Sequence, residues 1–449
     1  MFKFAWLIVI GFLVFSSCSD YLDVKQDKSL VVLNTLDDLQ ALLDANRRMN
    51  QYVASIPIVS ADNYFMTDER YNATSDVYRL NYTWQETTVG FVSEWSTAYL
   101  AIYTANFCLE EIAEIQRTQK NAKAWDNVKG SALFFRAFRF LNLVWDFSKA
   151  YDSIASNKDL GIVLRMTTDI NVPSRRSNVG DCYDQIIKDC KTAAVYLPDF
   201  PRHVMRPSKV ATYGLLARTY LSMRAYDSAY RYAALCLNLK GDLLDYNNSE
   251  IVDSSELVPF GPFNQEMLFS AEYGGIQYDQ FFVDTALYKK YDEHDLRRNT
   301  FFYSARNGYH LFKGNYNSNN RALMFAGIAT DEIYLIKAEC ETRMGMNKSA
   351  LDDLNHLLSN RWESGFFVPV ALEDPSQLLN RILLERRKEL LFRGLRWMNI
   401  KRLNKENRNI TIVRHIGGTT FRLPPNDNRC AVPIPPEVIK MTGMPQNPR

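Results

Sequence analysis

Several residue patterns that mark metal-binding or catalytic proteins are missing from this sequence. Its 449 residues include 7 cysteines and 5 histidines, and neither a CxxC nor an HExxH motif occurs among them, so no metal site is expected. A glycine-rich phosphate loop and a serine nucleophile elbow are also missing. Cys182 and Cys190 would lie roughly 12 Å apart along one helix, too far for a disulfide. The sequence therefore predicts no cofactor and no catalytic residues.

The chain also lacks an excess of charge and a second long apolar run. Lys and Arg number 53 against 51 Asp and Glu, which gives a formal net charge of +2. Nucleic-acid-binding proteins usually carry a basic excess, so no nucleic-acid partner is expected. After the first residues, no apolar stretch approaches the roughly 20 residues of a membrane-spanning helix. A lipid would then be the only membrane anchor.

The N-terminus has the pattern of an export signal. A short basic start precedes Phe4–Phe15, an apolar run of 12 residues. A helix of that length is about 18 Å long and cannot cross a bilayer core of about 30 Å, so residues 1–17 are predicted to be a signal peptide. Two serines directly before Cys18 match a bacterial lipoprotein cleavage site, with Cys18 as the lipid attachment residue. The alternative is an ordinary secretory signal with an incidental cysteine; in both cases the protein leaves the cytoplasm.

Helical periodicity dominates most of the remaining chain. Apolar residues recur at spacings of three and four, as at Trp95, Tyr99 and Ile102, which indicates amphipathic helices. We expect helices over residues 94–115, 125–147, 181–197, 208–239 (broken near 224–227), 331–344 and 348–360, and one long helix from about 376 to 403. Residues 50–85, 240–325 and 404–449 are expected to be loops with short helices.

Large and small residues alternate in some of these helices as they do in tetratricopeptide repeats. The pattern is clearest in Leu216, Ala217, Tyr220, Ala229 and Cys236. Small residues allow the two helices of a repeat to approach, and the large ones fill the groove beside them. The expected fold is therefore all-α, with tetratricopeptide-like helical pairs as its scaffold.

Residues 381–402 hold eight basic side chains and two acidic ones, a composition also found in nucleic-acid-binding helices. Glu385 with Lys388, and Glu389 with Arg393, stand at the spacings of helical ion pairs. Apolar residues recur along one side of the same segment. We therefore interpret it as a structural helix with a solvated charged face.

Motifs along the chain resemble the SusD/RagB family of outer-membrane nutrient-binding lipoproteins. They occur in the family's order and span nearly the whole mature chain: Cys18-Ser-Asp-Tyr-Leu-Asp-Val, Leu215-Leu-Ala-Arg-Thr-Tyr-Leu, Glu332-Ile-Tyr-Leu-Ile-Lys-Ala-Glu, Glu385-Arg-Arg-Lys-Glu-Leu-Leu-Phe-Arg-Gly, Pro433-Ile-Pro and Gln446-Asn-Pro. Two positions depart from the family pattern, namely Arg393, where Glu is common, and the C-terminal Arg449.

The resemblance implies a surface-exposed lipoprotein of the Bacteroidetes outer membrane. Such proteins are non-catalytic; they capture oligosaccharides, or sometimes peptides, and deliver them to a TonB-dependent (SusC-like) transporter. It also implies an N-terminal region with the helical repeats (18–240), on which a C-terminal region (241–449) packs as one fold. The loop-rich insertions would form the ligand-binding face.

A cluster of aromatic and polar residues in the first of these insertions is the candidate ligand site. Sugars present apolar C–H faces and polar edges, so their sites combine exposed rings with hydrogen-bonding side chains. The candidate residues are Asp62, Asn63, Tyr64, Arg70, Tyr82 and Trp84, with Tyr278 from the second insertion. The alternative is that Tyr82 and Trp84 are buried core residues of their loop.

Two other functions are compatible with the sequence. An all-helical surface glycoside hydrolase would need two carboxylates roughly 5–10 Å apart, drawn from separate elements. Asp352 and Asp353 are candidates by composition alone, and we interpret them as surface or capping residues. A tetratricopeptide adaptor that binds only protein is the third possibility.

Overall fold

A computed structural model describes residues 33–53, 55–86, 92–274, 281–317 and 323–449. Cys18, the predicted lipid attachment residue, and Tyr278 lie outside these ranges. Within them, none of the helices combines the length and the apolar character needed to cross a membrane. The six cysteines of the described ranges are all buried and unpaired.

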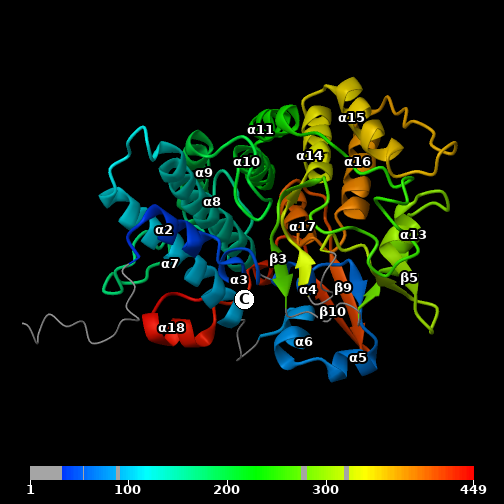
Figure 1. The fold of residues 1–449 in the computed structure, drawn as a ribbon. Helices are drawn as coiled ribbons and strands as arrows, with labels where there is room; N and C mark the ends of the chain where they lie inside the picture. The colour runs from blue at the N-terminus through cyan, green and yellow to red at the C-terminus, as the bar shows by residue number, and fades with distance from the viewer. Residues whose placement is uncertain (1–32, 54, 87–91, 275–280, 318–322) are drawn as a thin grey trace, which may run out of the picture.

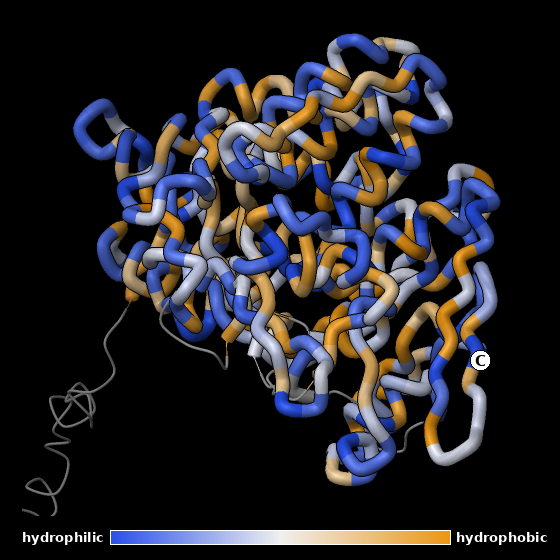
Figure 2. The backbone as a smooth tube through the Cα atoms, turned by 90° about the vertical axis from the view of Figure 1, so that its right-hand side faces the viewer, coloured by the Kyte–Doolittle hydropathy of each residue, from blue (hydrophilic) through white to orange (hydrophobic). Residues whose placement is uncertain are grey.

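Long helices that follow one another along the chain pack side by side and form the scaffold (Figure 1). They are α7 (Val92–Glu114), α8 (Ala122–Phe147), α9 (Val179–Tyr196), α10 (Lys209–Met223), α11 (Tyr226–Leu239), α14 (Thr330–Arg343), α15 (Asn347–Ser359) and α16 (Pro375–Glu389). The prediction of a mainly helical fold is confirmed. Apolar residues recur along these helices, while several loops at the edge of the molecule are polar (Figure 2).

Local signals explain where these helices begin and end. The side chains of Asn178, Ser208 and Asp374 each accept a hydrogen bond from the backbone N–H three residues later, and so cap α9, α10 and α16. Arg224 has a φ of +63° and ends α10, which confirms the predicted break there. Gly345 has a φ of +80° and forms the turn between α14 and α15.

The predicted repeat residues pack as their sizes suggest. Leu216, Ala217, Ala229 and Cys236 are fully buried where α10 and α11 meet their neighbours. Gly214 also belongs to this close packing, because a Cβ atom there would lie 2.8 Å from the Ile328 side chain. The spacing of small residues thus brings the two helices together.

Short elements lie on this scaffold, most of them in the regions expected to be irregular; α2, α3, α17 and β8 lie outside those regions. The helices are α2 (Leu36–Leu43), α3 (Asn46–Met49), α4 (Ile56–Ser60), α5 (Asp68–Ala73), α6 (Asp76–Tyr82), α12 (Thr285–Tyr288), α13 (Arg297–Phe301), α17 (Arg396–Asn404), η3 (Asn428–Cys430) and α18 (Pro436–Thr442). The antiparallel strand pairs are β1 (Tyr64–Phe65) with β4 (Phe282–Val283), β2 (Met267–Phe269) with β8 (Ile328–Ala329), β3 (Glu272–Gly274) with β7 (Leu323–Phe325), β5 (Phe302–Ser304) with β6 (His310–Phe312), and β9 (Ile412–Ile416) with β10 (Thr419–Leu423).

The hairpin of β9 and β10 was not predicted. Its register pairs Ile416 with Thr419 and leaves Gly417 and Gly418 as a two-residue turn. Both glycines have positive φ, +54° and +76°, as the hairpin turn that matches strand twist requires. The Gly-Gly pair was the available signal for this hairpin.

The single long helix predicted for residues 376–403 is wrong. The chain leaves the helix after Glu389 and re-enters one at Arg396. Between them Phe392 and Gly394 have φ of +56° and +75°, which no right-handed helix accommodates. The turn redirects α17 against α4 and α10.

Most charged side chains of residues 381–402 are buried. The expectation that they form a solvated charged face is therefore wrong. Arg297 pairs at 2.7–2.8 Å with Asp295, Glu385 and Glu389, and Arg361 pairs at 2.7 Å with Glu266 and Glu389. These carboxylates hold the pKa of Arg297 well above its usual value despite burial. Lys388 and Glu385 form the predicted pair at 3.3 Å. Arg393 pairs instead with Asp331 at 2.7 Å.

Candidate ligand-binding groove

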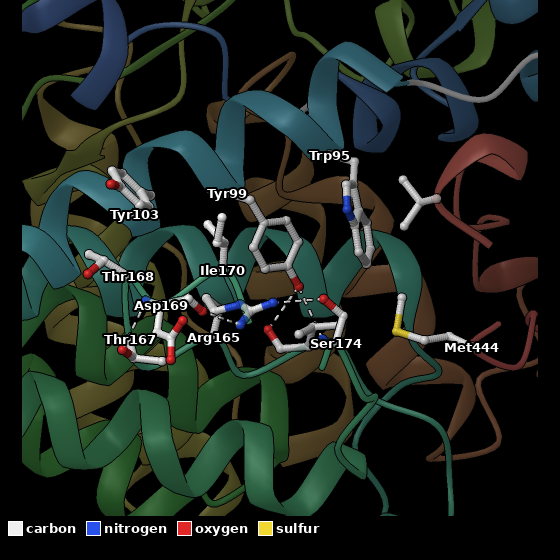
Figure 3. A pocket seen from close by; sticks show the side chains of 12 residues that line it. Trp95, Tyr99, Tyr103, Arg165, Thr167, Thr168, Asp169, Ile170, Ser174 and Met444 are labelled. Carbon is white, nitrogen blue, oxygen red and sulfur yellow. Dashed lines mark hydrogen bonds between the residues drawn. The ribbon is translucent and has the colours of Figure 1, made fainter. Parts of the chain in front are cut away.

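Helix α7 carries three aromatic rings at a spacing of four residues, which places them on one side of the helix (Figure 3). Trp95 packs edge-on against Phe147 and lies 4.8 Å from the ring of Tyr99. Burial decreases along the helix: Trp95 is buried, Tyr99 is partly exposed, and Tyr103 is 45% exposed. The three rings form one wall of a groove with a volume of about 330 Å³.

The opposite wall is the segment between α8 and α9, with α18 and its following residues at one end. Val163, Arg165, Thr167, Thr168, Asp169, Ile170 and Ser174 line it, with Val438 and Met444 at the end. Figure 3 shows Met444 beside Trp95 and, at the other end, Thr168 near Tyr103. This volume lies within the range of small-molecule sites. The other cavities described here offer 10–20 Å³.

Hydrogen bonds fix the second wall to α7. The Tyr99 hydroxyl donates to the Val163 carbonyl oxygen at 2.9 Å and accepts from the Val163 N–H at 3.1 Å. Burial holds the pKa of Tyr99 above its usual value, so the hydroxyl stays neutral and can donate. Asn106 Nδ2 donates to the Arg165 carbonyl oxygen at 2.9 Å, and Glu110 accepts from the Thr168 N–H at 2.9 Å. The groove is therefore largely preformed.

The Arg165 guanidinium is hydrogen-bonded within the second wall of the groove. Its guanidinium donates to the Val172 carbonyl oxygen and to Ser174 Oγ, each at 2.8 Å. Asp169 is the one carboxylate among the described residues that line the groove. A two-carboxylate hydrolytic pair is therefore not assembled by these lining residues. The groove offers ring faces, hydroxyl groups and one acid, which suits a neutral polar ligand with apolar faces.

The structure places the predicted aromatic cluster in the interior. The rings of Tyr64 and Tyr82 lie 5.4 Å apart, and the Arg414 guanidinium lies 4.2–5.5 Å from both and from the Trp84 ring. Each of the three aromatic residues is at most 3% exposed. Trp84 Nε1 donates to the Ser60 carbonyl oxygen at 3.2 Å, and the Arg414 guanidinium lies 4.2 Å from the Tyr82 ring centre. This geometry corresponds to the alternative of buried core residues. The hydrophobic effect outweighed the polar character of the surrounding sequence.

The polar members of the predicted cluster connect loops to the scaffold. Asp62 accepts two hydrogen bonds from Arg396, at 2.7 and 2.9 Å. Although burial opposes it, Arg396 and Arg387 hold the pKa of Asp62 well below its usual value. Asn63 is also buried and accepts from Arg387 at 3.4 Å. Arg70 lies on α5 and is partly exposed.

Two sets of rings offered to solvent were missed as candidates. The first is the groove on α7, because the spacing of its rings predicts an amphipathic helix but does not show which rings face solvent. The second comprises Phe65, Phe282 and Tyr309, which are partly exposed and lie 5.0–5.6 Å apart between centroids. The exposure of both sets of rings depends on contacts between segments distant in the sequence, and helical periodicity does not predict such contacts.

Comparisons with known proteins agree with the fold. A family model described as "Starch-binding associating with outer membrane" matches residues 20–221, and a model described as "SusD family" matches residues 277–449. The chain is similar to SusD-like protein P2 of Formosa agariphila, at 24% identity over 428 residues that cover 80% of this chain and 81% of that protein.

Solved structures show the same architecture. A SusD superfamily protein from Bacteroides thetaiotaomicron aligns with a TM-score of 0.76 at 21% identity, covering 92% of this chain and all of the other. A putative sugar binding protein from Bacteroides vulgatus aligns with a TM-score of 0.75 at 20% identity, covering 93% and 99% of the two chains. At these identities the likeness establishes the fold.

Proposed function

Because the chain belongs to the SusD/RagB family, a family of outer-membrane-associated carbohydrate-binding proteins, we propose that it captures oligosaccharides without cleaving them. It would then deliver them to a TonB-dependent outer-membrane transporter. The proposed site is the groove between α7 and the segment 163–174. The lipid on Cys18 would anchor the protein at the outer membrane, with the protein exposed at the cell surface.

The observation that carries this proposal is the graded exposure of the three rings on α7. Trp95 and Tyr99 are fixed by packing and hydrogen bonds, while Tyr103 presents nearly half of its surface to solvent. A rigid ring offers contact area to a sugar's C–H face at little cost in conformational entropy. Thr167, Thr168 and Ser174 stand where they could meet the sugar's hydroxyl groups.

Peptides are the second ligand class considered for this site. A peptide would also fit a groove of this volume, and its backbone could bond to the same hydroxyl groups. We favour oligosaccharides because the Arg165 guanidinium is already bonded within the wall and the lining is otherwise close to neutral.

The hydrolase alternative meets a structural difficulty. The deeply buried carboxylates of the C-terminal half are bound in ion pairs, as with Glu385, Glu389 and Glu332. Asp353 pairs with Lys337 at 2.5 Å. These carboxylates are engaged in structural contacts, which supports a binding protein over an enzyme.

The experiment that tests this function is a combined binding and turnover measurement on the mature chain. Neutral oligosaccharides, acidic oligosaccharides and peptide mixtures are titrated calorimetrically, and each glycan sample is then assayed for new reducing ends. We expect binding of a neutral oligosaccharide and no new reducing ends. New reducing ends would support the hydrolase, binding of peptides alone would support the second ligand class, and no binding of either would favour a protein adaptor.

A further inference from the structure

Arg386 is a buried cation whose guanidinium makes no hydrogen bond with the part of the chain that the structure describes. It lies on α16 with a side chain about 2% exposed. None of its three guanidinium nitrogens has a hydrogen-bond partner among the described residues. Its closest ion-pair contact is with Glu332, whose Oε1 lies 3.6 Å from Nη2. A buried charge left in this way is costly unless something compensates it.

The carboxylates around Arg386 are already bound by other arginines. Glu332 accepts from Arg218 at 2.9 Å and 2.5 Å, and Glu339 accepts from Arg402 at 2.6 Å and 2.7 Å. Arg343 also pairs with Glu339, at 3.0 Å, and with Glu406, at 2.8 Å. Four guanidinium groups therefore meet three carboxylates here, which leaves one positive charge in excess. Burial, together with the charges of Arg402 and Arg218, lowers the pKa of Arg386 to about 10, so it remains protonated at neutral pH.

Arg386 also lines a small cavity. Arg386, Arg387 and Arg396 line it together with Asn63, Asn399 and four leucines (Leu383, Leu390, Leu395 and Leu403). Arg387 and Arg396 share the carboxylate of Asp62, at 3.4 and 2.7 Å, and Arg387 also lies 3.9 Å from the carboxylate of Asp284. The cavity has room for about 10 Å³, which is the size of one water-sized occupant. Its walls thus combine leucine side chains, two asparagines and three cationic residues, with no carboxylate among these lining residues.

We propose that this cavity binds one small monovalent inorganic anion, of the size and charge of chloride. An anion would supply the missing acceptor for Arg386 and neutralise the excess charge, whereas a water molecule would supply only the acceptor. A volume of about 10 Å³ suits one small ion better than the larger phosphate, sulfate or sugar acid. The site is separate from the groove on α7, so it does not depend on the proposed function.

The first measurement is thermal unfolding of the mature protein at constant ionic strength, with sodium gluconate replaced stepwise by sodium chloride. An anion that binds only the folded state raises the unfolding temperature as its concentration exceeds its Kd. We expect this rise in the wild type and in Arg117→Met, a control at an exposed ion pair with Asp126. Arg386→Met should unfold at a temperature that does not depend on the anion.

The second measurement locates the ion in crystals grown with sodium bromide. We expect an anomalous peak at hydrogen-bond distance from the Arg386 guanidinium in the wild type. A site that holds only water would overturn the proposal. A bromide peak without any chloride-specific stabilisation in solution would also overturn it, because it would indicate an adventitious ion only. If Arg386→Met does not fold, the wild-type comparison of the two salts and the bromide map still decide.

Discussion

At the scale of single residues, two aromatic side chains have opposite environments. Trp84 stands in a polar stretch and is 3% exposed, whereas Tyr103 stands in a largely apolar stretch and is 45% exposed. The difference arises from partners distant in the sequence: Arg414 of β9 lies over the Trp84 ring at 5.5 Å. Sequence reasoning could name aromatic candidates but could not determine which rings face solvent.

Trp84→Ala should lower the stability of the protein and leave ligand affinity unchanged. The substitution removes a buried indole and the hydrogen bond to Ser60, so the free energy of unfolding should fall by about 3–5 kcal/mol. Chemical denaturation and calorimetric titration of the same variant test both parts. Weaker binding at unchanged stability would restore Trp84 as a ligand contact.

Glu94 should make stability depend on pH. Burial raises its pKa to about 7, against hydrogen bonds from Ser55 and Ile56 that lower it. Because the folded-state pKa lies above the unfolded value of about 4.5, the folded protein binds the proton more tightly. This contribution to stability is complete below about pH 4.5 and is lost as the pH rises to about 7.

The variant Glu94→Gln removes this titration and leaves the other buried groups in place. Between pH 4.5 and 7.5 the wild type should lose roughly 3 kcal/mol of unfolding free energy relative to the variant. Urea denaturation at several pH values measures the difference. Parallel stability curves for the two proteins would show that Glu94 titrates normally.

At the scale of elements, the helices with strong periodicity and clear ends could be predicted from the sequence. The break at residues 224–227 was predictable, and Gly345 marked the next turn. The break at 390–395 was not, because Glu385–Arg402 keeps a helical spacing of apolar residues throughout. The strand pairs β1–β4, β2–β8 and β3–β7 were not predictable either, since each strand depends on a partner far along the chain.

Gly394→Ala tests the turn between α16 and α17. The φ of +75° disfavours any residue with a Cβ atom, although there is open space around the position. The free energy of unfolding should fall by about 1–2 kcal/mol. Gly261→Ala is the matched control, because it also has open space but no positive φ, and it should be close to neutral. Equal effects of the two substitutions would remove backbone strain as the explanation.

At the scale of the whole molecule, buried ion pairs join segments that no sequence pattern connects. Arg361 links the end of α15 to Glu266, before β2, and to Glu389 of α16. Glu389, whose spacing predicts a solvated helix face, is therefore part of the core. Family motifs predicted the overall architecture and the class of function, whereas the position of the groove required the assembled structure.

Cys18→Ala tests the proposed anchor. Without the acyl chains the protein should leave the membrane fraction, since the described residues contain no spanning helix. The measurement is immunodetection in membrane and soluble fractions of cells that lack the transporter, because transporter binding alone could retain the variant. Retention of the variant in the outer-membrane fraction would contradict lipid anchoring at Cys18.

The most direct test of the central claim is calorimetric titration of an oligosaccharide ligand into the wild type, Tyr103→Ala and Phe200→Ala. Phe200 is 53% exposed and does not line the groove, so its removal is the matched control. Loss of a stacking ring worth about 1.4 kcal/mol should weaken binding to Tyr103→Ala about tenfold, with Phe200→Ala unchanged. Equal affinities for all three proteins would contradict the account and direct attention to Phe65, Phe282 and Tyr309.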